Sequence, residues 1–360
     1  MRFRAWIRRW LERLLGRKVA PPTCSYAITE DDLRVLADTA ERELQALSTI
    51  VLEGRKPPTG AYAFFHHSGH TLARLKDCRL ILQRLYQGRR LLTDLAWEHR
   101  SMRLRGELVD GPGDRPLLES EQRENEAVSY MQIDLESLYL FGGTLLDQWA
   151  YQAIAVGGLA FTKEQREKPF IALLDHLESK KAQSGPLKPL WDECGKSMIW
   201  LHCHLRVYRN TFIVHSNRPW QRGNDRGTFG EDFQLHTPSP PGWLDDAEVD
   251  AKILELGRRA GVSTAEGDDE WRRPPLTLQN LMARIADLPK ADRDEVIRLY
   301  KAKGGSTPTF QVIANRLFEL IATGTSVLIR IAETDLGRVE LGPPTLTSAD
   351  MWKALREEES

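Results

Sequence analysis

Histidine and arginine side chains recur along the stretch "LHCHLRVYRNTFIVHSNRPW", residues 201–220. On a helix, His202, Arg206 and Arg209 stand at positions i, i+4 and i+7, which places them on one polar stripe between apolar neighbours. Two guanidinium groups held on one helix suit a phosphate, because each planar fork can donate two hydrogen bonds to its oxygens. A histidine beside them can transfer a proton near neutral pH. The stripe therefore predicts phosphate chemistry, with His202 and Arg206 as substrate-binding residues.

The same stripe also has a purely structural interpretation. Its arginines can form ion pairs with acids of neighbouring helices, for instance Asp134, Glu136 or Asp147, while His202 or His215 caps or packs. Charged stripes on helices are usually solvated or paired faces, so spacing alone favours this interpretation.

Two histidine clusters could in principle hold a metal ion. In "FFHHSGH", His66 and His70 are i,i+4 neighbours, a spacing that can ligate zinc. The glutamate of an HExxH motif is missing and Gly69 interrupts the pattern, so we interpret this segment, with His67, as a surface loop or a helix start. In "HCH", residues 202–204, i,i+2 side chains diverge on a helix. We therefore expect no metal and no cofactor.

Glycine-rich motifs give no support to the common nucleotide-binding or hydrolase folds. The chain contains no GxxxxGK(S/T), no GxGxxG after a strand and no GxSxG. The two glycines of "FGG", residues 141–143, lie inside a helical pattern. We expect them to allow a close approach between helices and not to cradle a phosphate.

The segment "YRNTFIVHS" resembles the signature of the HEPN superfamily (higher eukaryotes and prokaryotes nucleotide-binding), in which an arginine, commonly followed by a polar residue, precedes a histidine by four to six residues. Arg209, Asn210 and His215 match it. "DLESLYLFGGTLLDQWA" is similar to the helix that packs beside this motif in HEPN bundles, and the resemblance covers residues 70–230. Many HEPN proteins are metal-independent endoribonucleases of toxin–antitoxin, phage-defence or RNA-processing systems, and others keep the fold without cleavage.

This resemblance implies a role for each matching residue. Arg209 would bind the scissile phosphate, His215 would transfer a proton of the 2′-OH or of the leaving oxygen, and Asn210 would orient one of them. On an ideal helix Arg209 and His215 point about 240° apart, so one straight helix cannot aim both at one phosphate. Either the helix distorts or ends before His215, or two copies of the motif meet across a homodimer with the helix 190–217 near its two-fold axis.

Helical periodicity dominates the chain, which predicts an all-α protein. The resemblance implies that its bundle is HEPN-like, with additional N- and C-terminal helices. Thr29 is a candidate N-cap for the first clear helix. Pro169 indicates that the regular part of a later helix, which Thr162 would cap, starts late. The expected helices cover residues 29–54, about 70–105, about 119–155, 162–181 and about 190–217, and the last four are expected to form the bundle.

Gly, Pro, Asp and Asn concentrate after this bundle, which indicates a linker, and short helical patterns follow. We therefore divide the chain into a basic N-terminal helix, a helical region that contains the HEPN-like bundle at about 70–230, a linker, and an appended C-terminal helical region. These parts span residues 1–22, 23–230, 231–275 and 276–360.

Composition bounds the class of protein. Hydrophobic residues make up 41% of the 360 residues, enough for a real core, and the formal net charge is −1, which gives no overall field to attract nucleic acid. The four cysteines are scattered, as in a reducing compartment, so we expect a cytoplasmic protein. No apolar run is long enough to predict a transmembrane segment. The expected partners are RNA, a second copy of the chain, and an antitoxin or other partner protein.

The N-terminal residues 2–18 have an amphipathic pattern. Trp6, Trp10 and Leu14 can share one helical face, with arginine and lysine side chains mostly elsewhere. Such a helix can lie on an anionic membrane. We favour the other interpretation, in which its tryptophan face packs on the protein itself, because most amphipathic helices do so.

Overall fold

The computed structural model describes residues 28–53, 61–105, 115–160, 162–179, 185–210, 246–259, 278–303 and 308–336. Every regular element in these ranges is a helix and none is a strand, which confirms the all-α prediction. The predicted N-terminal helix and most of the predicted linker lie outside the described residues.

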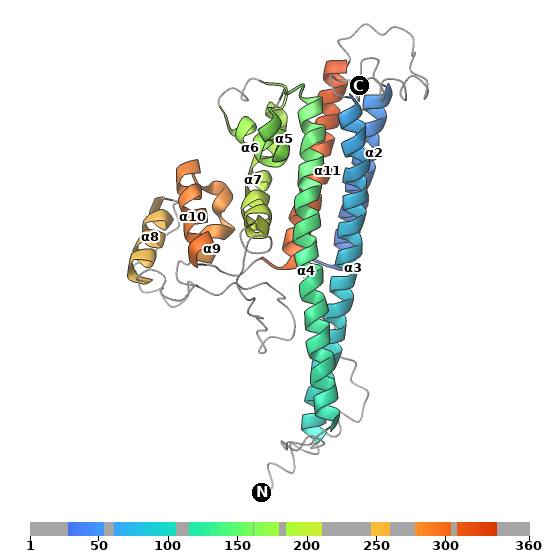
Figure 1. Ribbon diagram of the computed structural model, residues 1–360, viewed down its shortest axis with the longest axis vertical. Helices are drawn as coiled ribbons and strands as arrows, with labels where there is room; N and C mark the ends of the chain where they lie inside the picture. The colour runs from blue at the N-terminus through green and yellow to red at the C-terminus, as the bar shows by residue number, and fades with distance from the viewer. Residues whose placement is uncertain are drawn as a thin grey trace.

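Four long helices form the main bundle (Figure 1). They are α2 (Glu30–Glu53), α3 (Ala61–Arg105), α4 (Arg115–Val156) and α11 (Phe310–Leu336). α11 packs against α2 and α4, and the core between the four helices contains fully buried large side chains such as Leu44, Leu85, Trp149 and Phe318. α3 and α4 are the longest elements and extend past α2 and α11 as a two-helix hairpin.

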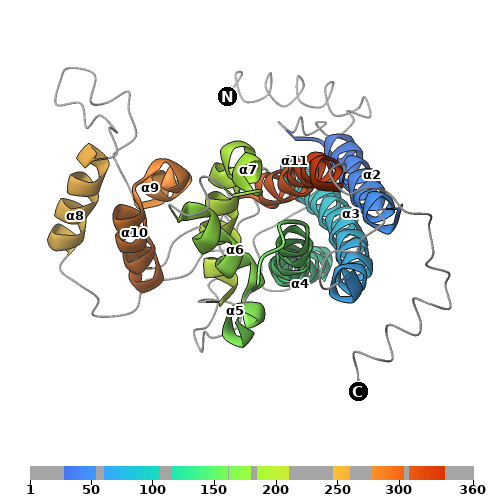
Figure 2. The same cartoon turned by 90° about the horizontal axis from the view of Figure 1, so that it is seen from above.

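A set of shorter helices packs on one side of this bundle (Figure 2). It begins with α5 (Lys163–Glu167), α6 (Pro169–Glu178) and α7 (Lys188–Leu201), and α7 continues directly into the π-helix η2 (His202–Val207). α8 (Asp246–Arg259), α9 (Leu278–Ala283), the 3-10 turn η5 (Ile285–Asp287) and α10 (Lys290–Lys303) follow. α6 contacts α4 and α7 contacts α11, so these two helices connect the outer helices to the bundle.

Local sequence signals set several helix ends. Thr29 caps α2 as predicted: the Asp32 amide donates to its Oγ1 at 3.1 Å, and its own amide donates to the Asp32 carboxylate at 2.9 Å. Thr162 and Gln165 form the equivalent capping box on α5. The predicted helix 162–181 is two helices, because Pro169 begins a new one at α6.

The membership of the bundle differs from the prediction. We expected residues 276–360 to be an appended region, whereas α11 lies in the main bundle between α2, α4 and α7. The reason is its broad apolar face, which is buried from Phe310 to Ala332. In addition, α8 lies within residues 231–275, the range that we assigned to a linker.

α11 is also the one described helix that is long and apolar enough to cross a membrane by length and composition. The sequence analysis identified no such segment. The span covers Phe310–Thr334, and 61% of its apolar window is buried inside the molecule. Its packing against three other helices is that of a core helix.

Candidate functional site

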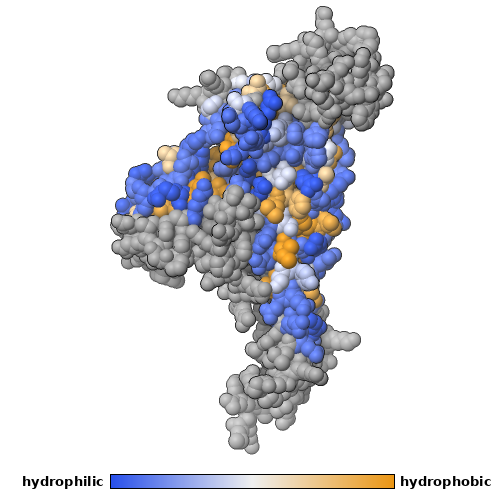
Figure 3. All heavy atoms as spheres, in the orientation of Figure 1, coloured by the Kyte–Doolittle hydropathy of each residue, from blue (hydrophilic) through white to orange (hydrophobic). Residues whose placement is uncertain are grey.

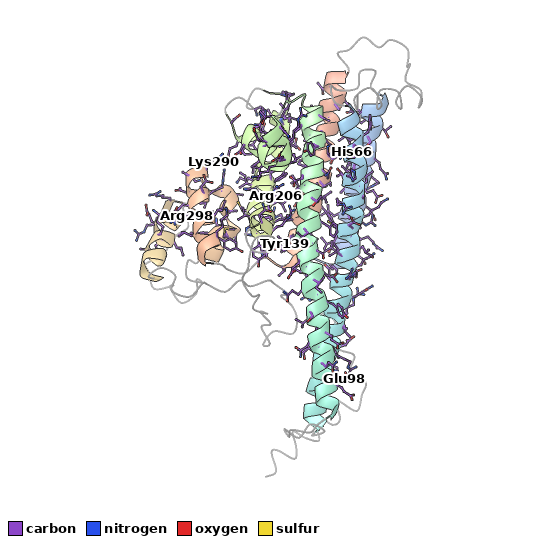
Figure 4. All side chains as sticks on the ribbon, in the orientation of Figure 1. His66, Glu98, Tyr139, Arg206, Lys290 and Arg298 are labelled. Atoms are coloured by element: carbon purple, nitrogen blue, oxygen red, sulfur yellow. The ribbon has the colours of Figure 1, made fainter. Side chains whose placement is uncertain are left out.

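The predicted site residues other than His215 lie on η2 and the residues just after it, where the side helices face α4. In a π-helix each hydrogen bond reaches five residues back, so the winding is wider than in the α-helix that the i, i+4, i+7 spacing assumed. The helix therefore distorts within the predicted site, at residues 202–207. This winding changes the direction in which each of the predicted residues points. Figure 4 marks Arg206 at the position where η2 faces α4.

Arg206 is buried, with 4% of its surface exposed. Its Nη1 donates to the Asp147 carboxylate on α4, which also accepts a hydrogen bond from the Phe170 amide at 3.3 Å. The guanidinium lies 5.9 Å from the centre of the Phe170 ring. We predicted Arg206 as a substrate-binding residue, but this arrangement uses it in an internal ion pair with one of the three acids named above.

His202 is neutral at pH 7. Burial lowers its pKa to about 4, and the positive charge of Arg206 acts in the same direction. The Nδ1 atom is buried with no hydrogen-bond partner among the described residues. A histidine with this pKa is a poor proton donor near neutral pH, so the proton-transfer role suggested for the stripe does not suit His202.

His204 is a structural residue that couples η2 to α9. Its Nε2 lies 2.7 Å from the carbonyl oxygen of Met282, and its ring packs at 4.3 Å from the ring of Trp200. Burial lowers its pKa to about 4 as well. The side chain thus holds the α9 segment against the end of α7.

Arg209 is the arginine of the motif, and its side chain is partly exposed. Burial lowers the pKa of its guanidinium, Arg206 adds to this effect, and Asp147 opposes it. An arginine nevertheless stays charged in proteins. Among the described residues no carboxylate lies within ion-pair distance of Arg209, and its Nε is buried without a hydrogen-bond partner. Its positive charge is therefore not neutralised by this part of the chain.

Two glycines of α4 make room for this segment. A Cβ atom on Gly143 would lie 3.0 Å from both Cδ and Nη1 of Arg209, and one on Gly142 would lie 3.1 Å from Leu205 and Leu317. The pair therefore allows α4 to approach η2 and α11 closely, as the sequence predicted.

Of the other two predicted catalytic residues, one lies within the described residues and the other does not. Asn210 directly follows Arg209 and is partly exposed. His215 lies outside the described residues. Arg209 and Asn210 therefore follow the end of η2 as neighbours in the chain.

The histidines of "FFHHSGH" lie in the first turns of α3, which begins at Ala61. His67 stacks on Tyr151 with 3.8 Å between ring centres and pairs with Gln148 through Nδ1, while the rings of His66 and His70 are 4.5 Å apart. No group of three or more metal-ligating side chains occurs among the described residues.

Comparisons with known proteins found no similar protein. No family model, curated protein or solved structure matches this chain. The resemblance to HEPN domains therefore depends on the motif and on the all-α fold.

Proposed function

We propose that this chain is a HEPN-like, metal-independent endoribonuclease in which Arg209 binds the scissile phosphate. The observation that supports the proposal is the state of Arg209: a partly exposed guanidinium that the described residues do not neutralise, held against the backbone of Gly143. Such a fixed, uncompensated cation attracts an anion, and a planar fork suits a phosphate.

The proposed reaction uses the RNA's own nucleophile. The 2′-OH oxygen forms a bond to the adjacent phosphorus while the bond to the 5′ oxygen breaks, which leaves a 2′,3′-cyclic phosphate and a 5′-OH. His215 accepts the 2′-OH proton or donates one to the leaving oxygen, Arg209 stabilises the charge on the phosphoryl oxygens, and Asn210 orients one of these groups.

Purified protein should cleave RNA in EDTA and leave these ends, and substrates with deoxyribose at the cleaved position should survive. Arg209→Ala and His215→Ala should each lower the rate by on the order of 10² to 10⁴. Arg209→Lys should also be poor, because a point ammonium cannot replace the guanidinium fork. Arg34→Ala, on the exposed surface of α2, is the control. A requirement for Mg²⁺, or full activity of the His215 variant, contradicts the proposal.

A second candidate function is a non-catalytic HEPN-like module that binds a nucleotide or a partner protein such as an antitoxin. Arg206 and His202 were predicted to bind the substrate beside Arg209, but both side chains are directed into the protein. This arrangement favours the second function. In this case wild-type protein leaves RNA intact but binds a labelled nucleotide by fluorescence anisotropy, and Arg209→Ala abolishes that binding.

A site that combines Arg209 of one copy with His215 of another would require two copies of the chain. If a homodimer brings two Arg209–His215 motifs together, mixed dimers of the Arg209 and His215 variants should recover part of the activity that each variant lacks. Light scattering that shows a monomer at micromolar concentration counts against this arrangement.

A further inference from the structure

An apolar patch lies on the exposed side of the α3–α4 hairpin (Figure 3). We call it the hairpin stripe, and its members are large apolar residues with 37–65% of their surface exposed: Leu80 and Leu91 on α3, and Tyr130, Ile133 and Leu140 on α4. Five large apolar side chains gathered on one exposed face can serve as an interaction surface, whereas single exposed apolar side chains are ordinary.

The two halves of the hairpin stripe face the same direction. Leu80 and Leu91 are four residues before and seven residues after Arg84, so all three share one face of α3. Arg84 reaches across to Asp134 at 2.6 Å, and Asp134 is adjacent to Ile133 on α4. The patch is therefore continuous across the hairpin.

Negative charge surrounds the α4 half. Between residues 119 and 136, α4 carries five glutamates and one aspartate but a single cation, Arg123. Arg123 pairs with Glu98 of α3 at 3.4 Å, and Asp134 pairs with Arg84. Glu126 and Glu136 accept hydrogen bonds from the neutral amides of Gln122 and Gln132, and no arginine or lysine of the described residues forms an ion pair with either carboxylate. A basic, amphipathic occupant would complement this face.

The N-terminal residues 2–18 have that chemistry. Their pattern gathers Trp6, Trp10 and Leu14 on one helical face, and the segment contains six arginines and one lysine against a single glutamate. As a helix it would be about 25 Å long, enough to cover the roughly 15 Å between Tyr130 and Leu140 on α4.

The position of the first described residue also allows this segment to reach the hairpin stripe. The described chain begins at Ile28, whose carbonyl accepts a hydrogen bond from the Tyr86 hydroxyl at 3.1 Å. Tyr86 lies on α3 between Leu80 and Leu91, so the connection begins at the level of the stripe. Residues 19–27 can span about 30 Å when extended, against a helix diameter of about 10 Å.

We propose that residues 2–18 form an amphipathic helix that docks its tryptophan face on the hairpin stripe, with its basic residues opposite the acids of α4. A short tether gives the segment a high effective concentration at this surface. The same acids disfavour an anionic membrane at the hairpin, so the segment binds its own protein in preference to lipid.

Cross-linking in the full-length chain tests the position directly. Trp10→Cys is combined with Ile133→Cys or, as a control, with Val35→Cys, an exposed apolar position on α2. Cys24→Ser removes the nearby thiol, and burial raises the pKa of Cys78, Cys194 and Cys203 to about 12, which keeps them unreactive. A short bismaleimide should link the new thiols at positions 10 and 133 within one chain, at a rate independent of protein concentration. In the control variant it should not link position 10 to position 35.

Each alternative occupant gives a different result. Links between chains that increase with concentration identify a second copy as the occupant, and equal linking to position 35 identifies a mobile segment; both results overturn the proposal. Absence of a link, together with Trp10-dependent binding to vesicles of phosphatidylserine and phosphatidylcholine, identifies a membrane anchor and also overturns it.

A double-mutant cycle gives a second measurement that does not need new thiols. Trp10→Glu and Ile133→Glu should each lower the melting temperature, and the double variant should be no less stable than the less stable single variant because both remove the same contact. Val35→Glu is the control and should leave the melting temperature unchanged. Fully additive effects of the two stripe variants contradict the proposal.

Discussion

Acid should destabilise this protein in a pH range set by His202, which is partly buried, and His204, which is buried. His202 and His204 have pKa values of about 4 in the folded protein, because burial disfavours the charged imidazolium. In the unfolded chain the value is 6.5. Between these values the unfolded state binds protons that the folded state does not, so the free energy of unfolding falls as the pH falls from 6.5 and the loss is complete below about pH 4.

The magnitude follows from the two pKa values. A shift from 6.5 to about 4 corresponds to at most about 3.4 kcal/mol for each histidine, of which about 2 kcal/mol is lost by pH 5. Together the pair should lower the free energy of unfolding by about 4 kcal/mol between pH 7 and pH 5, a large part of the roughly 5–15 kcal/mol typical of a folded protein.

Urea denaturation followed by circular dichroism at pH 7, 6 and 5 measures this loss. His204→Gln keeps a donor for the Met282 carbonyl but cannot titrate, so it should reduce the loss at pH 5 by about 2 kcal/mol. If the His204 variant loses as much stability at pH 5 as the wild type, the reasoning from burial is refuted.

Two further predictions concern the packing of the bundle. Asp147→Asn leaves the buried Arg206 guanidinium without its carboxylate and should cost about 3–5 kcal/mol in urea denaturation, whereas the apolar pair Asp147→Leu with Arg206→Met should cost much less. Gly324→Ala should lower the melting temperature, because its Cβ would lie 2.5 Å from Cζ2 of Trp149. Gly69→Ala meets no atom within 4 Å and should stabilise α3 by about 0.5–1 kcal/mol; an equal effect of the two alanines would contradict the packing argument.

The sequence predicts local structure here better than it predicts contacts. Thr29 and Pro169 act through bonds to residues a few positions away, so their effects follow from the sequence alone. The Arg206–Asp147 pair depends on how two helices pack, and spacing could not choose among three candidate acids. Ideal α-helical winding also gave the wrong directions for His202, Arg206 and Arg209, because residues 202–207 form a π-helix.

The candidate site shows the same limit. The motif identifies Arg209 and Asn210. Whether the charge of Arg209 is neutralised depends on which carboxylates other helices bring near it, and only the fold gives that information. The hairpin stripe was missed for a different reason. Tyr130, Ile133 and Leu140 follow ordinary helical spacing, and only the structure shows that no described helix covers this face of α4.

The position of α11 in the bundle has a consequence for the order of folding during synthesis. α2, α3 and α4 leave the ribosome first, yet the groove that buries Trp149 and Leu44 is completed only by α11, near the other end of the described chain. A nascent chain therefore exposes apolar surface until residue 336 has emerged, and the bundle must close by a long-range contact. A ribosome that stops in the region of α8 to α10 would release a chain with an open core, which is a substrate for chaperones and proteases.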